Sequence, residues 1–223
     1  MNDAMKTVLK NHEKDKPHRY PRAVRALLSG LSLSLCAALC IYAVVEANTQ
    51  TEELIKENES HSISKKIISL LPPEANTKGM VLTCYEVSNK NIGHNQKLFV
   101  AFKGPDILGY VMTYATSMGY SDPLIMISGF THNKKIYKAD IQFSQETPGL
   151  GDKVDRKHGN FLDMLNGYGL NDAKFDVKKN GGDFDYITGA TITSRATVVA
   201  THNALKVLNS VELSRLKKCR VVN

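Results

Sequence analysis

Hydroxyl side chains gather in one short segment near the C-terminal end of this chain. Residues 185–194 read Asp-Tyr-Ile-Thr-Gly-Ala-Thr-Ile-Thr-Ser, with hydroxyls at Thr188, Thr191, Thr193 and Ser194. A side-chain hydroxyl can form an ester with a phosphate group. The small pair Gly189-Ala190 leaves room for a bulky group to reach a neighbouring hydroxyl. The segment is therefore a candidate site for attaching or binding a phosphorylated ligand.

An amphipathic helix is predicted to begin near Thr193, directly after this segment. Its apolar stripe has helical spacing and consists of Ala200, Thr201, Ala204, Leu205, Leu208 and Val211. Thr193 or Ser194 is the predicted N-cap, because hydroxyl side chains are favoured there. The free N–H groups and positive dipole of a helix N-terminus favour a phosphate. The alternative is an ordinary capped helix without a ligand, and spacing alone favours that alternative.

The elements before this helix are predicted to be strands joined by short turns. Five runs are rich in apolar and β-branched residues, and polar, Gly- or Pro-containing turns separate them: Met80–Tyr85, Leu98–Phe102, Ile107–Tyr114, Leu124–Phe130 and Ile136–Phe143. Consecutive strands with short turns indicate an antiparallel meander. We expect a short helix at Phe161–Leu165 and a further strand at Phe175–Val177. The predicted fold class is α+β, an antiparallel sheet with flanking helices.

The N-terminal part of the chain has the pattern of a membrane anchor. Residues 26–45 form a run of 20 residues without a charge, which as a helix spans about 30 Å, the thickness of the hydrocarbon core. Residues 1–25 carry seven Lys and Arg against three acids. This arm is predicted to be cytoplasmic and the main domain extracytoplasmic. A signal peptide cleaved near Val45-Glu46-Ala47 is the alternative, although its apolar run is unusually long.

The remaining boundaries follow from composition. Residues 46–75 are predicted to form a stalk or first helix that ends at Pro72-Pro73, because proline lacks the N–H that continues a helix. Residues 76–223 then form the main domain. The basic excess lies mostly in the arm, so the sequence does not indicate a nucleic-acid-binding protein. None of the seven histidines has the spacing of a metal ligand set, and no metal is expected.

The four cysteines divide by location. Cys36 and Cys40 lie in the apolar run, where cysteine behaves as a small apolar residue. Cys84 and Cys219 lie in the domain predicted to be extracytoplasmic, where an oxidising environment favours one disulfide. Two unpaired thiols are the alternative.

The hydroxyl-rich segment resembles a known attachment motif. Asp185-x-x-Thr188-Gly189-Ala190-Thr191-x-Thr193 matches, at each specified position, the flavinylation motif of the FMN-binding domain family. Segments 146–153 and 178–185 also resemble this family. The resemblance implies that a flavin transferase moves FMN from FAD onto Thr191 and forms a phosphoester, so that FMN is a covalent cofactor.

The same resemblance implies roles for the surrounding residues. Thr188, Thr193 and the backbone N–H groups near Ser194 are expected to hold the phosphodiester. Asp185 is expected to be read by the transferase or to orient the loop. The flavin ring is expected to be lined by a second segment, with contacts from Glu146, Thr147, Leu150, Gly151 and Lys153.

Anchor and domain together are similar, in order and spacing, to the G subunits of Rnf ion-translocating electron-transport complexes. This similarity implies an electron-transfer subunit in the inner (cytoplasmic) membrane, with one span and other Rnf subunits as partners. It also supports the Cys84–Cys219 disulfide, because such subunits often have cysteines there. The alternatives are the C subunit of a sodium-translocating NADH:quinone reductase and a cofactor-free, membrane-anchored interaction module.

Overall fold

The computed structural model describes residues 21–121 and 123–219. They fall into two compact units, Met1–Ser60 and His61–Asn223, of which the first begins with residues outside the described part. Most of the predicted basic arm, residues 1–20, lies outside the described residues.

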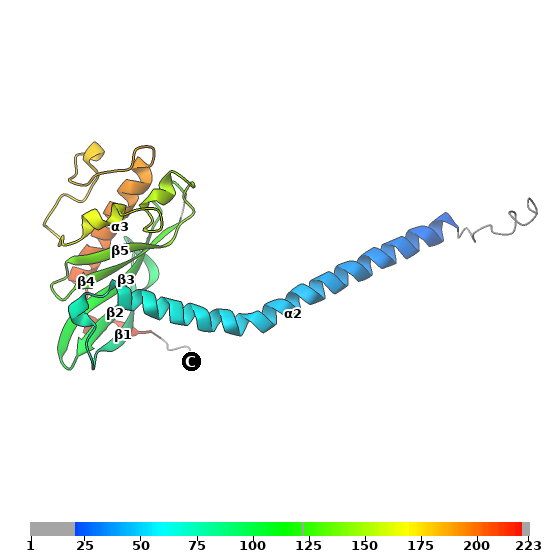
Figure 1. The fold of residues 1–223 in the computed structure, drawn as a ribbon, viewed down its shortest axis with the longest axis horizontal. Coiled ribbons are helices and arrows are strands. Elements are labelled where there is room, and N and C mark those ends of the chain that lie inside the picture. The colour runs from blue at the N-terminus through cyan, green and yellow to red at the C-terminus, as the bar shows by residue number, and fades with distance from the viewer. Residues whose placement is uncertain (1–20, 122, 220–223) are drawn as a thin grey trace, which may run out of the picture. The chain divides into compact units, whose positions relative to one another are not determined.

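Helix α2, Arg22–Leu70, is drawn from blue to cyan in Figure 1. Its segment Ala23–Thr49 is long and apolar enough to cross a membrane, and its described side chains are exposed. The serine hydroxyls of this segment bond to carbonyls one turn earlier, as Ser29 does to Ala26 at 3.0 Å. These bonds satisfy polar groups inside the helix, as a lipid environment requires. The helix ends at Leu70, before the predicted proline stop, and a single 3₁₀ turn follows at Pro73–Ala75.

Six strands form one antiparallel sheet in the order β5-β4-β3-β2-β1-β6. The strands are β1 Val81–Asn89, β2 Gly93–Lys103, β3 Asp106–Thr116, β4 Leu124–Thr131, β5 Ile136–Phe143 and β6 Lys217–Lys218. The predicted meander of five strands and the α+β class are confirmed. Strand β6 was not predicted, because two exposed lysines carry no strand pattern. It pairs with β1 beside the predicted disulfide, which joins Cys84 to Cys219.

One face of the sheet packs against helix α3, Thr191–Ser210, which carries the predicted apolar stripe. The hydroxyls buried at this contact are hydrogen-bonded to one another or to the backbone. Thr201 donates to the carbonyl of Thr197 at 2.8 Å, so Tyr114 donates to Thr201 at 2.9 Å and accepts from Ser128 at 2.6 Å. Burial raises the pKa of Tyr114 to about 12. This chain of hydrogen bonds explains why Thr201 fits an otherwise apolar stripe.

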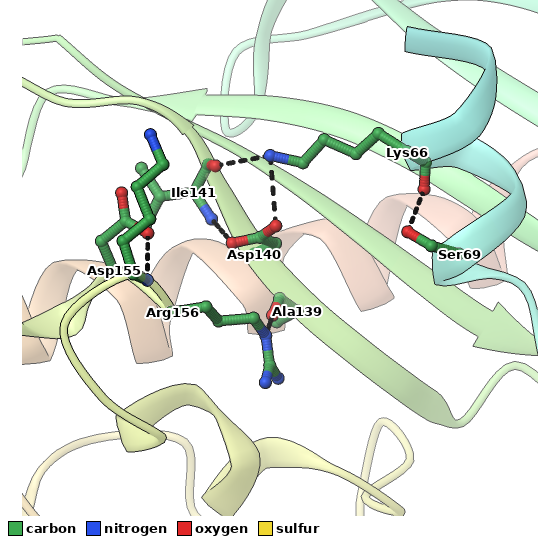
Figure 2. A network of polar contacts seen from close by, with 8 residues as sticks. Lys66, Ser69, Ala139, Asp140, Ile141, Asp155 and Arg156 are labelled. Atoms are coloured by element: carbon green, nitrogen blue, oxygen red, sulfur yellow. Dashed lines mark hydrogen bonds and ion pairs between the residues drawn. The ribbon is translucent and has the colours of Figure 1, made fainter. Parts of the chain in front are cut away.

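The opposite face of the sheet holds the last turns of α2. Their apolar side chains pack on the middle strands, a cluster that includes Ile67, Leu70, Leu71, Ala101, Val111 and Ile127. The contact is close at Gly129, where a Cβ would overlap the carbonyl oxygen of Leu70. In Figure 2, Lys66 reaches from α2 to the edge strand β5, with Nζ 3.1 Å from Asp140 and 2.9 Å from the carbonyl of Ile141. Arg156 bonds to the carbonyl of Ala139 on the same edge.

Between β5 and α3 the chain forms loops and 3₁₀ turns rather than further strands. The predicted short helix is confirmed as a 3₁₀ helix at Phe161–Leu165. The predicted strand at Phe175–Val177 is wrong, since Val177 makes only an isolated bridge to Phe184. The reason is local: the Asp176 carboxylate accepts the N–H of Val177 at 2.8 Å. Gly182 packs directly on the backbone of Asp176, which closes the segment into a compact loop.

Candidate functional site

A cavity of about 610 Å³ opens at the start of α3. Three loops and the first turn of the helix line it. The lining residues are Tyr120, Glu146, Thr147, Leu150, Gly151, Lys179, Gly189, Ala190, Thr191, Ile192 and Thr193. The structure therefore brings together two segments that the sequence singled out separately, around residues 146–151 and 189–193. A cavity of this volume lies in the range typical of small-molecule and cofactor sites.

The first turn of α3 presents backbone N–H groups at this cavity. The helix begins at Thr191, and its N-cap is Ala190, whose side chain caps nothing. The predicted cap at Thr193 or Ser194 is wrong, because both hydroxyls have other partners: Thr193 donates to Glu146 and Ser194 to the carbonyl of Ala190. Among the described residues, no acceptor contacts the N–H groups of Thr191, Ile192 and Thr193. Three donors at the positive end of a helix suit an anion.

Ser194 supports the turn before the helix instead of lining the cavity. Its side chain is buried, its N–H donates to Ala190 at 2.9 Å, and its hydroxyl accepts the N–H of Ile187 at 3.0 Å. The N–H of Ser194 is therefore not available to a ligand, and the N–H groups without an acceptor among the described residues are those of the three residues that precede it. The turn ends at Gly189, whose φ of +87° is left-handed and favours glycine.

The hydroxyls of the motif differ in their surroundings. Thr191 is half-buried and lines the cavity, whereas Thr188 is exposed and lies outside the lining. Thr193 lines the cavity but is 1% exposed, with its hydroxyl 2.8 Å from Oε2 of Glu146. Of the predicted hydroxyls, Thr191 alone lines the cavity and has a side-chain oxygen without a hydrogen-bond partner among the described residues. Its hydroxyl is therefore the one of this group that a ligand in the cavity can reach without breaking a hydrogen bond to a described residue.

Glu146 joins three walls of the cavity. Its Oε1 accepts the N–H groups of Tyr120 at 3.0 Å and Ser121 at 3.2 Å, and its Oε2 accepts the Thr193 hydroxyl. The residue is only 6% exposed. Glycines provide the space around it, because a Cβ at Gly119 or Gly151 would lie 2.7 or 2.6 Å from a carboxylate oxygen. Glu146 therefore fixes the loops around the start of α3.

The loop after Glu146 forms an apolar part of the wall. It turns at Gly149, with φ of +77°, as the Pro-Gly pair predicts. Thr147, Leu150 and Gly151 line the cavity, whereas Lys153 is exposed and lies outside the lining. The Leu150 side chain is 46% exposed.

Residues outside the predicted set complete the wall. Tyr120 is 71% exposed and Ile192 is 54% exposed, and both line the cavity with Leu150. Exposed apolar side chains that converge on one cavity suit a planar aromatic ligand. Ile192 lies outside the apolar stripe of α3, so packing on the sheet does not explain its apolar side chain. This was a signal in the sequence that Ile192 could line a site. The sequence favoured an ordinary loop tyrosine at Tyr120 over a contact with the ring, because its place depends on the fold of the preceding loop.

A loop with two lysines closes the remaining side. Lys178 pairs with Asp185 at 2.7 Å, and the pKa of Lys178 is raised by this hydrogen bond. Asp185 itself is exposed and lies outside the cavity lining. Lys179, next in the chain, lines the cavity and was not in the predicted set.

The two-lysine loop is tied to α3 by an ion pair. Arg195 contacts both carboxylate oxygens of Asp176 at 2.8 to 3.1 Å, and the pKa of Asp176 is lowered by these hydrogen bonds. The loop position is thus linked to the second turn of the helix that begins at Thr191.

This part of the chain combines N–H donors at the start of a helix with an apolar wall and a hydroxyl. Together these features are those of a binding domain for a phosphorylated aromatic cofactor. Residues 119–206 match the family described as FMN-binding domain. The residues present fit FMN: N–H donors at the start of α3 suit the phosphate, and Tyr120, Leu150 and Ile192 suit the ring.

Relatives that match most of the chain are named as G subunits of an ion-translocating oxidoreductase complex. The protein of Cronobacter sakazakii is 33% identical over 196 residues, which cover 85% of this chain and 94% of the relative. The Yersinia pestis protein is 31% identical with the same coverage, and that of Shewanella baltica is 31% identical over 82% of this chain and 89% of its own. The chain belongs to the family of G subunits of ion-translocating oxidoreductase complexes.

Proposed function

We propose that this chain is the flavin-carrying, electron-transferring subunit of a membrane-bound ion-translocating oxidoreductase complex of the Rnf type. FMN is joined to it through a phosphoester on the Thr191 hydroxyl. The observation that carries the proposal is the position of Thr191. It is the first residue of α3, and its side chain lines the cavity beside N–H groups that have no acceptor among the described residues.

The attachment step needs a hydroxyl that the cavity leaves accessible and a fixed phosphate. The Thr191 oxygen forms one P–O bond to the FMN phosphate of FAD, the diphosphate bond breaks, AMP leaves, and the hydroxyl proton is released. A flavin transferase is the partner that performs this step. Asp185 is exposed, so it is accessible to that enzyme or orients the loop through its pair with Lys178.

Once attached, FMN supplies the capacity to accept and release one or two electrons, which no side chain here provides. The chain's own residues bind and orient the group. The N–H groups of Thr191, Ile192 and Thr193 would hold the phosphate, and the side chains of Leu150 and Ile192 would contact the ring. Glu146 keeps the loop at Tyr120 in place.

The membrane arrangement is part of the proposal. Residues 1–25 form a cytoplasmic arm, 26–45 span the inner membrane, 46–75 form the stalk, and 76–223 form the extracytoplasmic FMN domain. The apolar segment Ala23–Thr49 supports the span. The disulfide between Cys84 and Cys219 supports an oxidising side of the membrane for the domain. Other subunits of the complex are the expected partners in electron transfer.

The proposal is tested by flavin fluorescence of the denatured protein after expression with a flavin transferase. Thr191→Val is expected to abolish the fluorescent band, because only the hydroxyl is lost and the shape is kept. Thr83→Val is the matched control and is expected to retain the band, since Thr83 lies in β1, outside both the motif and the cavity lining. A fluorescent Thr191→Val protein, or a wild-type protein without flavin, would refute the assignment.

A further inference from the structure

The cavity beside Thr191 is lined by two charged side chains among the described residues, Glu146 and Lys179. The Glu146 carboxylate is buried and accepts three hydrogen bonds, so its charge is already stabilised within the protein. Lys179 is exposed, and its ammonium has no ion pair or hydrogen-bond partner in the part of the chain that the structure describes. The charged side chain left free to pair with a ligand in this cavity is therefore that of Lys179.

The backbone around Lys179 is well fixed. The N–H of Lys178 donates to the carbonyl of Phe184 at 2.7 Å, and that of Gly182 donates to the carbonyl of Val177 at 3.1 Å. The ion pair of Asp176 with Arg195 joins this loop to α3. The loop therefore holds Lys179 at the rim of the cavity, although the lysine itself makes no anchoring contact.

The two adjacent lysines differ in their electrostatic state. Lys178 is paired with Asp185 at 2.7 Å, so its charge is largely offset. Lys179 has no such carboxylate and lines the cavity. An unpaired ammonium at the rim of a cavity favours an anion there, because no carboxylate of the described residues is paired with it to offset its charge.

We propose that Lys179 offsets the negative charge of FMN in this cavity and so raises the reduction potential of the flavin. This inference rests on the proposed function. FMN has two sources of negative charge: the phosphodiester in both redox states, and the ring after reduction. Because three N–H groups at the start of α3 already face the phosphate, the charge left for Lys179 to offset is that of the reduced ring.

The potential is measured by redox titration of the flavinylated full-length protein in detergent. Lys179→Gln is expected to lower the ratio of reduced to oxidised flavin at a fixed applied potential by roughly tenfold, about 30 mV for a two-electron couple. Lys179→Arg keeps the charge and is expected to stay near wild type. Lys174→Gln is the matched control, since it removes one charge from the same loop but not from the cavity lining, and is expected to have a smaller effect.

A second measurement locates the lysine independently of electron transfer. Acylation of amines, followed by peptide mass spectrometry, compares flavinylated wild type with the flavin-free Thr191→Val protein. Lys179 is expected to react several-fold more slowly when flavin is attached, whereas exposed Lys157 is expected to react equally in both.

Each combination of outcomes decides the proposal. Protection together with a lowered potential in Lys179→Gln supports pairing with the ring. Protection without a shift overturns the effect on potential and assigns Lys179 to the phosphodiester. Attached flavin without protection of Lys179, whether or not the potential shifts, overturns the proposal but leaves the attachment at Thr191 intact. Wild-type protein without covalent flavin overturns both.

Discussion

At the scale of single residues, the hydroxyl-rich motif divides into groups with different tasks. Thr191 lines the cavity, Thr193 bonds to Glu146, and Ser194 closes the turn that precedes α3. The motif singled out a segment that lines a cavity in the structure, but it did not predict this division. Which hydroxyl is buried depends on where the helix begins, and the true start is two residues before the predicted one.

Replacement of Glu146 tests its role as the residue that joins the cavity walls. Glu146→Ala is expected to lower the free energy of unfolding by about 1–3 kcal/mol, because it leaves buried donors from two loops and α3 without an acceptor. Thermal unfolding, followed by circular dichroism, measures the effect. Gln145→Ala is the control, since Gln145 is exposed. Equal unfolding temperatures for the two variants would show that Glu146 does not hold the site together.

The pair of Asp176 and Arg195 predicts a dependence of stability on pH. The folded-state pKa of Asp176 lies below its usual value, so the pair stabilises the protein above the unfolded-state pKa near 3.8 and loses this contribution as the pH falls through the folded pKa. Asp176→Asn is expected to cost about 1 kcal/mol at pH 7, a value reduced by solvent screening of the half-exposed Arg195. Denaturant unfolding at pH 7 and at pH 3 measures it. A cost that is undiminished at pH 3 would contradict the ionic origin.

At the scale of elements, the positions of the strands and of α3 could be predicted because alternation and helical spacing are local patterns. The long segment between β5 and α3 could be predicted at its 3₁₀ helix Phe161–Leu165 but not elsewhere, since bonds such as that of the Asp176 carboxylate to the N–H of Val177 leave no periodic pattern in the sequence. The edge of the sheet, drawn in Figure 2, is a second example. No local pattern in the sequence indicates the contacts that Lys66, Asp140 and Arg156 make there. In the fold, the two cations bond to β5 carbonyls and so protect an edge that would otherwise be open to pairing.

The contact between the end of α2 and the sheet predicts a strict requirement for glycine at position 129. Gly129→Ala is expected to destabilise the protein by about 1–3 kcal/mol or more, because its Cβ would collide with the Leu70 carbonyl and force backbone to move. Gly159→Ala is the control, since the nearest atom to a Cβ there lies 4.0 Å away. Thermal unfolding compares the two. A Gly129→Ala protein as stable as the control would show that α2 does not pack against β4 in this way.

At the scale of the whole molecule, the sequence predicted both the apolar anchor and the disulfide. It could not predict β6, because that strand exists only where Cys219 is held next to β1. The disulfide joins cysteines 135 residues apart, so it ties the end of the described chain to the first strand of the sheet.

Removal of this disulfide is expected to have a large effect on stability. A double replacement of Cys84 and Cys219 by alanine should lower the free energy of unfolding by up to about 4–5 kcal/mol in the chain-entropy model. Denaturant unfolding of the full chain in detergent measures the loss. In parallel, a thiol reagent without reductant should label Cys36 and Cys40 alone. Four labelled cysteines in the unreduced protein would contradict the bridge.

The most direct test of the central claim is the mass of one peptide. After co-expression with a flavin transferase, trypsin should release residues 180–195, which contain each hydroxyl of the motif. The attachment at Thr191 predicts that this peptide gains the mass of FMN less one water. It also predicts that fragment ions place the gain on Thr191. An unmodified peptide, or a gain placed on Thr188 or Thr193, would contradict the account.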